Sequence, residues 1–209
     1  MNNYVITIGR GYGSGGRTIG KMLSGELGIN YYDKEILRLA SKASGINEQF
    51  FAQADEKLKA TTIFKVAKNV YRGEQFVNGA DESVSNANMF NYQARVITEL
   101  ADRESFVIIG RSADYVLRNK KNVVRVFVHA SMEHCAKTVG SMSSLSEYEI
   151  EQFIKKTDLH RAEYYRYNTG REWSDARNYD LCLNTDEMTL ENCVAVIKSY
   201  LTIKGIIKK

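Results

Sequence analysis

Five of the eight residues from position 9 to position 16 are glycines, in the order Gly-Arg-Gly-Tyr-Gly-Ser-Gly-Gly. The preceding residues 4–8 are apolar and mostly β-branched, which is typical of a buried parallel strand. Residues 17–27 carry apolar side chains at helical spacing, and Gly28 follows as a helix stop. A glycine turn between a strand and a helix exposes backbone N–H groups where no Cβ blocks an anion. The segment therefore predicts a phosphate-binding loop, and its glycines are attributed to close ligand approach.

The loop fits two nucleotide-binding patterns. Residues 11–18 match GxxxxGK[ST] with Arg17 in place of the lysine, and Thr18 is then the expected Mg²⁺ ligand. The same glycines match GxGxxG, and Asp33 lies 17 residues beyond Gly16, as in dinucleotide-binding proteins. A phosphotransferase and a dinucleotide-dependent oxidoreductase both remain open at this point. The residues expected to contact nucleotide phosphates are Gly11, Gly13, Ser14, Gly15, Gly16, Arg17 and Thr18.

Short apolar strands alternate with helical segments along the chain. The predicted strands are residues 4–8, 29–32, 106–109, 123–128 and 179–183. Alternation of this kind predicts a three-layer α/β/α fold with a five-stranded parallel sheet. Asp33 is expected to cap the second helix, Ser131 a short helix, and Ser146 with Glu149 a long one. Ligands bind at the carboxyl ends of such strands, where the glycine loop, Asp33 and Arg111 all fall.

A basic segment near the end of the chain favours phosphoryl transfer. Residues 155–177 contain six lysines or arginines and four acidic residues. Transfer of a phosphoryl group needs several cations around it and a lid that excludes water, whereas hydride transfer does not need them. The expected lid residues are Lys156, Asp158, Arg161, Arg166 and Arg171.

Composition excludes several other classes of protein. The net charge of +4 is mild, and no apolar run is long enough to span a bilayer. The three cysteines show no CxxC spacing, and the three histidines show no HxxxH spacing, so neither a disulfide framework nor a zinc site is expected. We expect a cytoplasmic protein with nucleotide partners, no nucleic-acid partner and no membrane partner.

Seven ordered blocks of sequence resemble the cytidylate kinase-like family of P-loop nucleoside monophosphate kinases. The blocks are residues 8–17 (IGRGYGSGGR), 31–35 (YYDKE), 107–115 (VIIGRSADY), 127–130 (FVHA), 156–165 (KTDLHRAEYY), 169–173 (TGREW) and 178–185 (NYDLCLNT). The resemblance implies a transferase that moves the γ-phosphoryl group of ATP, with Mg²⁺, to a nucleoside monophosphate. It also implies one domain, with a core of residues 1–43, 96–134 and 178–209, a monophosphate-binding helical insertion at about 44–95 and a lid at about 135–177.

Site roles follow from the resemblance by position. The glycine loop and Arg17 would hold the ATP phosphates, and Asp33 would lie at the acceptor site. Arg111 would hold the acceptor phosphate, and Arg161 would close over the transferring group. Arg17, Arg111 and Arg161 are therefore the expected catalytic residues, acting by positioning and charge neutralisation.

The sequence departs from the family pattern at the loop. In the gapless alignment, Gly16 stands where the family has a lysine, and Arg10 replaces the first glycine of the loop. In the alternative alignment, Arg17 replaces the lysine. Ser112 stands where the family has an aspartate after its Gly-Arg pair, and Lys137 is the only cation in residues 135–144. A catalytically weak, nucleotide-binding or regulatory protein of the same fold is the alternative function.

Overall fold

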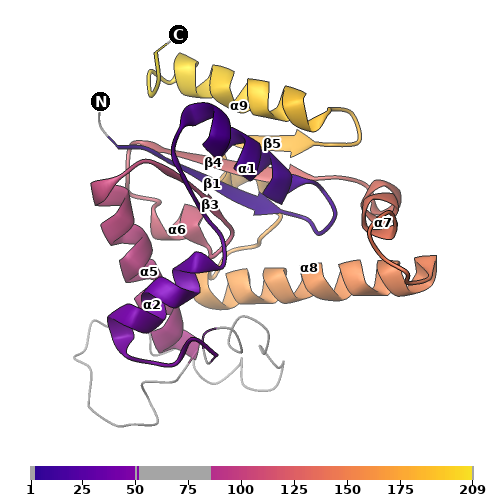
Figure 1. Ribbon diagram of the computed structural model, residues 1–209, viewed down its shortest axis with the longest axis horizontal. Coiled ribbons are helices and arrows are strands. Elements are labelled where there is room, and N and C mark those ends of the chain that lie inside the picture. The colour runs from indigo at the N-terminus through magenta and orange to yellow at the C-terminus, as the bar shows by residue number, and fades with distance from the viewer. Residues whose placement is uncertain (1–2, 50, 52–85, 209) are drawn as a thin grey trace.

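The computed structural model describes residues 3–49, 51 and 86–208, and it contains one five-stranded sheet with the order β2-β3-β1-β4-β5 (Figure 1). Every strand pairing is parallel. The strands are β1 (Val5–Arg10), β2 (Asn30–Tyr32), β3 (Phe106–Ile109), β4 (Val123–His129) and β5 (Leu181–Asn184). The predicted fold class and all five predicted strands are confirmed, with shifts of one to two residues at most strand ends.

Helices cover both faces of the sheet (Figure 1). On one face, α1 (Gly16–Leu27) and α9 (Leu190–Ile203) pack against side chains such as Ile6, Ile8 and Val126. On the other face, α2 (Glu35–Ser44), α5 (Asn86–Arg103) and α6 (Ala113–Val116) pack against Val5, Phe106 and Ile108. Successive residues of β1 thus face opposite layers, as strand alternation requires. Most of the predicted insertion lies outside the described residues.

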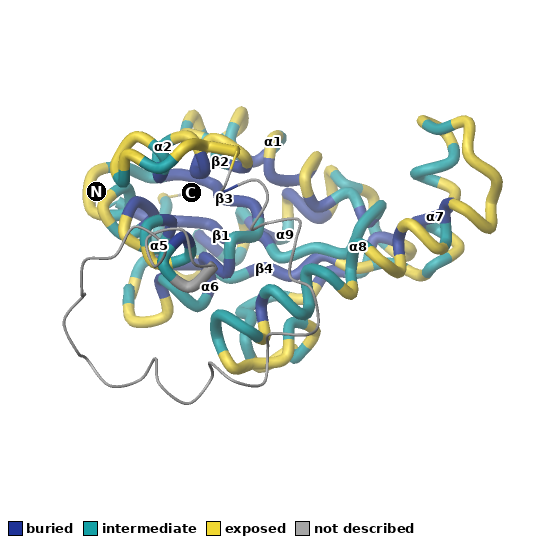
Figure 2. The backbone as a smooth tube through the Cα atoms, turned by 90° about the horizontal axis from the view of Figure 1, so that it is seen from below, coloured by how far each residue is buried: buried dark blue, intermediate teal, exposed yellow. Residues whose placement is uncertain are grey.

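Helices α7 (Met132–Gly140) and α8 (Glu147–Thr169) form a separate arm beside the sheet. Figure 2 shows α7 and the adjoining end of α8 projecting from the body of the molecule, with many exposed residues. A small apolar cluster that includes Cys135 and Ile154 joins the two helices. After α8, a short 3₁₀ helix (Ala176–Asn178) leads into β5.

Two of the three predicted helix caps are confirmed. The Ser131 hydroxyl accepts from the His134 N–H at the start of α7, and Ser146 with Glu149 forms a reciprocal capping box at the start of α8. The prediction for Asp33 is wrong, because α2 begins after Lys34 and has no side-chain cap. Instead, the Asp33 carboxylate forms an ion pair with Arg17, which is the more favourable partner for a largely buried acid.

Candidate functional site

The glycine loop connects the carboxyl end of β1 to the start of α1 and is held in shape by backbone hydrogen bonds. The Ser14 hydroxyl donates to the carbonyl oxygens of Gly11 and Val128, at 2.9 and 3.1 Å. From the end of β5, the Thr185 hydroxyl donates to the Ser14 carbonyl oxygen at 3.0 Å. Ser14 and Thr185 are both buried, so these contacts fix the loop backbone to β4 and β5.

The N-terminus of α1 presents backbone donors that have no partner within the described part of the chain. The N–H groups of Gly13 and Gly15, and those of residues 16–18, meet no acceptor there, and α1 has no side-chain cap. Unsatisfied N–H groups at a helix N-terminus bind phosphate readily, because the helix dipole adds to their partial charges. The loop is therefore suited to binding an anionic group such as a phosphate.

Protein packing gives some of the glycines a second role that sequence reasoning missed. A Cβ on Gly13 would lie 2.8 Å from the carbonyl oxygen of Cys135, and one on Gly15 would lie 2.6 Å from Cδ2 of Leu190. Both glycines also have left-handed φ angles, of 83° and 79°. The prediction that the loop glycines serve only the approach of a ligand is thus incomplete. Gly13 and Gly15 also allow α7 and α9 to pack closely against the loop.

Four arginines lie beside the loop, close enough for their charges to affect one another. Arg17 lies in the first turn of α1, and its Nε is 2.8 Å from the Asp33 carboxylate, which follows β2. Arg161 comes from α8, and its Nη1 contacts the Asp158 carboxylate at 2.9 Å and the Arg10 carbonyl oxygen at 3.1 Å. Arg111 follows β3, and its charge acts on that of Arg10 at the end of β1.

These groups carry an excess of positive charge. Burial, followed by the charge of Arg161, lowers the pKa of Arg10 to about 9, while Asp33 raises it and Arg111 and Arg17 lower it further. Burial likewise lowers the pKa of Arg161, despite its ion pair with Asp158. Arg10, Arg17 and Arg161, set against the carboxylates of Asp33 and Asp158, leave one net positive charge. The arrangement is therefore suited to an anion that is not part of the chain.

Asp158 connects α8 to the loop. Its two carboxylate oxygens accept from the backbone N–H of Tyr12, at 2.9 and 3.1 Å. Burial raises the pKa of this carboxyl, although the Tyr12 N–H and the Arg161 guanidinium act in the opposite direction. The Tyr12 ring lies between Arg161, 5.3 Å from its centroid, and Phe153, in edge contact at 5.1 Å. Helix α8 is thus held against the loop by charge and aromatic packing together.

The segment after β3 is conformationally strained. Gly110, Arg111 and Ser112 all have left-handed φ angles, of 66°, 62° and 48°. A non-glycine residue in this region costs on the order of 1–3 kcal/mol, and such strain concentrates at functional sites. The strained turn directs the chain from β3 into α6 and places Arg111 at the carboxyl end of the sheet, as the sequence predicts.

The other predicted lid residues do not reach the loop. Arg166 pairs with Glu172 at 2.9 Å on the surface, and the Arg171 guanidinium lies over the ring of Tyr115, 5.3 Å from its centroid. Lys156 is exposed on α8. Of the lid residues, only Asp158 and Arg161 therefore contact the phosphate loop in this structure.

The described residues include no group of three or more acidic, histidine or cysteine side chains that suits a metal ion. Thr18 lies exposed in the first turn of α1, next to the unpartnered N–H groups. A Mg²⁺ ion would accordingly be held mainly by nucleotide phosphate oxygens, with the Thr18 hydroxyl as the protein ligand. Among the helices that the structure describes, none is both long and apolar enough to cross a bilayer.

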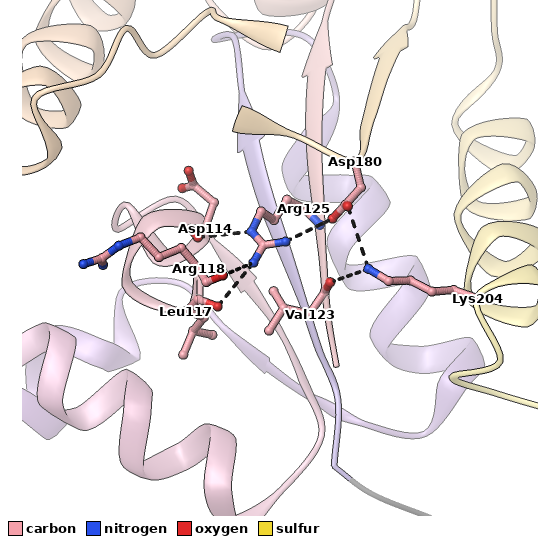
Figure 3. A network of polar contacts seen from close by, with 7 residues as sticks. All are labelled: Asp114, Leu117, Arg118, Val123, Arg125, Asp180 and Lys204. Atoms are coloured by element: carbon pink, nitrogen blue, oxygen red, sulfur yellow. Dashed lines mark hydrogen bonds and ion pairs between the residues drawn. The ribbon is translucent and has the colours of Figure 1, made fainter. Parts of the chain in front are cut away.

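A structural arginine elsewhere in the fold shows how such a group is normally satisfied. Arg125 of β4 donates to the carbonyl oxygens of Asp114, Leu117 and Arg118, and its Nη1 lies 3.5 Å from the Asp180 carboxylate. Figure 3 shows this guanidinium enclosed by carbonyl groups of the α6 segment and by Asp180. The network fixes α6 to the sheet and leaves no donor group directed at a ligand site.

Comparison with known proteins places the chain in a family. The model of the "Cytidylate kinase-like family" matches residues 5–187. A cytidylate kinase of Sulfurisphaera tokodaii is 24% identical over 200 residues, which cover 94% of each chain. One of Enterococcus faecalis is 25% identical over 226 aligned positions, which cover 98% of each chain.

Solved structures show the same fold. An uncharacterized protein from Eubacterium ventriosum superposes with a TM-score of 0.69 at 25% identity, covering 95% of this chain and 98% of the other. Shikimate kinase from Bacteroides thetaiotaomicron superposes with a TM-score of 0.53 at 15% identity, with the same coverage. The second likeness shows that the chain shares its overall fold with that enzyme.

Proposed function

Because the chain belongs to the cytidylate kinase-like family, we propose that it transfers the γ-phosphoryl group of ATP to a nucleoside monophosphate or a related small acceptor. The observation that carries this proposal is the excess positive charge of Arg10, Arg17 and Arg161 beside a loop whose N–H groups have no partner among the described residues. Phosphoryl transfer depends on such charge neutralisation and needs no strong base.

Each part of the site has a role in this reaction. The loop N–H groups and the start of α1 bind the donor phosphates, with Thr18 toward Mg²⁺. Arg111 lies at the acceptor side, where the strained turn after β3 holds it. Arg161 lies beside the donor phosphates, because it is fixed to Asp158 and to the carbonyl oxygen of Arg10 at the end of β1. Because the cations are already in place, the protein needs little rearrangement when charge moves between the phosphates.

Turnover of ATP tests this function. The purified chain is incubated with ATP, Mg²⁺ and each nucleoside monophosphate in turn, and ADP formation is followed in a coupled assay. We expect acceptor-dependent ADP formation with a cytidine or uridine monophosphate. ADP formation no greater than in the acceptor-free control, for every monophosphate tested, would show that the proposal is wrong.

A specific observation favours the second candidate, a nucleotide-binding protein with little catalysis. Arg17 is about half exposed and already paired with Asp33, so it is not held toward the loop as a phosphate-contacting cation would be. Calorimetric titration with ATP separates the two functions. Binding of ATP without turnover of any acceptor would favour the second candidate.

The dinucleotide-dependent oxidoreductase has less support from the site. In the dinucleotide-binding pattern, the acid at the position of Asp33 binds a ribose hydroxyl. In this structure the Asp33 carboxylate pairs with Arg17 instead. We expect titration with NAD to show no saturable binding.

A further inference from the structure

Arg10 adjoins the phosphate loop, and the sequence patterns leave the role of its side chain unexplained. It ends β1, one residue before the phosphate loop, and it is partly buried. A Cβ on Gly16 would lie 2.6 Å from the Cβ of Arg10 and 3.2 Å from its Cγ, and a Cβ on Gly110 would overlap its Nη1. The side chain therefore extends from the start of α1 to the end of β3, through space that two glycines keep open.

The Arg10 side chain fills the space that a side chain at position 16 would need. The crowding atom at Gly16 is the Cβ of Arg10, which cannot move without the β1 backbone, and the Cβ of Val128 stands 3.3 Å away on the other side. In the gapless alignment, position 16 is where phosphate-loop proteins carry the lysine that reaches the β- and γ-phosphates. A lysine at position 16 would thus compete with Arg10 for one volume.

The surroundings of Arg10 differ from those of a structural arginine. Its guanidinium donates no hydrogen bond to any residue in the described ranges, whereas that of Arg125 donates to three carbonyl oxygens (Figure 3). Three further arginines oppose its charge, whereas the carboxylates of Asp33 and Asp158 favour it. A partly buried cation among like charges destabilises the ligand-free protein, so its presence calls for an anionic partner.

We infer that Arg10 is a phosphate-binding residue that supplies, from the end of β1, the cation that a lysine at position 16 would otherwise supply. This inference deepens the proposed function and rests on it. The ligand group is the polyphosphate chain of a nucleoside triphosphate, because Arg10 lies between the loop, where donor phosphates would bind, and Gly110, which precedes Arg111 at the acceptor side. The planar guanidinium offers parallel donors to phosphate oxygens.

Replacement of the charge at similar side-chain size is the first test. Arg10→Met is compared with the wild type and with Arg125→Met, by calorimetric titration with ATP and with inorganic tripolyphosphate, and by thermal unfolding without ligand. We expect Arg10→Met to bind both ligands on the order of 10- to 100-fold more weakly, since a charge-assisted contact is lost.

Stability without ligand separates binding from a structural role. We expect the unfolding midpoint of Arg10→Met to stay the same or rise, because repulsion among the arginines is relieved, whereas that of Arg125→Met falls. Unchanged affinity for both ligands in Arg10→Met, or a fall in its midpoint as large as that of Arg125→Met, would overturn the inference.

An exchange of positions is the second test. Gly16→Lys alone should lower the unfolding midpoint, because its side chain meets Arg10. The pair Arg10→Gly with Gly16→Lys should recover ATP affinity to within a few-fold of the wild type. Gly25→Lys is the matched control, since Gly25 lies exposed on the same helix with nothing within 4 Å of an added Cβ; it should leave ATP affinity unchanged and should not lower the unfolding midpoint. If the double variant binds ATP no better than Arg10→Met, then a lysine at position 16 does not take over the space and the role of Arg10.

The outcomes distinguish this inference from the proposed function. A wild-type chain that binds ATP through Arg10 but phosphorylates no acceptor refutes the kinase function and supports the role of Arg10. An Arg10→Met variant with wild-type ATP affinity and turnover supports the kinase function and refutes the role of Arg10. A wild-type chain that binds neither ATP nor tripolyphosphate overturns both.

Discussion

At the scale of single residues, the arginines of this protein fall into two kinds. Arg125 is enclosed by acceptors and holds α6 to the sheet, whereas Arg10 and Arg161 are partly buried near one another and near the loop. Burial of a charge is costly unless a partner offsets it. Arg161 has such a partner in Asp158, whereas the Arg10 guanidinium donates to no residue in the described ranges and is therefore better explained by a ligand than by folding.

Asp158 provides a test of how the lid helix is attached. Asp158→Ala removes the acceptor of the Tyr12 N–H and the ion pair of Arg161, so we expect the free energy of unfolding to fall by about 2 kcal/mol. ATP affinity should also change, because Arg161 loses its fixed position. Urea unfolding measures the first quantity and calorimetry the second. Arg177→Ala breaks an ion pair made by an exposed arginine and is the control. A fall of equal size there would show that charge loss in general is responsible.

Asp114 predicts a pH dependence of stability. Burial raises the pKa of its carboxyl above the ordinary value near 4, although the Tyr165 hydroxyl, at 2.6 Å, opposes the shift. Between the ordinary and the raised pKa, the folded protein holds a proton that the unfolded chain has lost. The contribution of this group to stability is therefore complete below about pH 4 and is lost as the pH rises through the folded-state pKa.

The variant Asp114→Asn lacks this titration but keeps an acceptor for Tyr165. We expect it to be more stable than the wild type at pH 7, and the difference to shrink as the pH approaches 4. Urea unfolding of both proteins at several pH values measures the difference directly. A constant difference across this range would mean that Asp114 does not titrate as described.

At the scale of elements, α8 links a projecting arm to the phosphate loop. Its first turn is closed by the capping box of Ser146 and Glu149, and its middle carries Asp158 and Arg161. Ser146→Ala should lower the free energy of unfolding by about 1 kcal/mol, since an N–H at the start of the helix loses its acceptor.

ATP affinity should not change in Ser146→Ala, because the capping box lies three turns from Asp158. Thermal unfolding and calorimetry measure the two effects. Ser199→Ala, on the exposed side of α9, is the control for loss of a hydroxyl in a helix. Weaker ATP binding in Ser146→Ala would show that the start of α8 is coupled to the loop.

Local sequence patterns were enough to predict the elements of this fold but not all of its contacts. The five strands, the caps of α7 and α8 and the place of Arg111 follow from apolar runs, cap residues and strand ends. Asp33 was predicted wrongly as a cap, because its partner Arg17 comes from another element. The roles of Thr185 and Arg10 were not predicted. They depend on the sheet order, which places β5 beside β4 and β3 beside β1.

At the scale of the whole molecule, the sheet order brings distant segments to one edge. The strand order 2-3-1-4-5 puts β1 between β3 and β4, so the loop after β1 lies beside Gly110 on one side and Val128 on the other. Helix α8 then adds Arg161 from a point 151 residues away in the chain. The positive site is thus a product of topology rather than of any single segment.

Anion binding should therefore stabilise the entire fold. At a tripolyphosphate concentration about 100 times its Kd, we expect the free energy of unfolding to rise by about 2.7 kcal/mol. The gain should decrease at high salt, because the partly exposed Arg17 is screened. Thermal unfolding at matched ionic strength, with sodium chloride as the control, measures the effect. An equal shift with chloride would indicate a general salt effect instead of a site.

The close fit of Arg10 against Gly16 also limits how this protein can change over generations. A lysine cannot enter position 16 while the arginine side chain fills the space, and loss of the arginine first would leave the loop with neither cation. The two arrangements are consequently separated by an intermediate that is either crowded or weak in phosphate binding. A lineage that has adopted the arginine has no easy single-substitution route back, so positions 10 and 16 should be inherited as a pair.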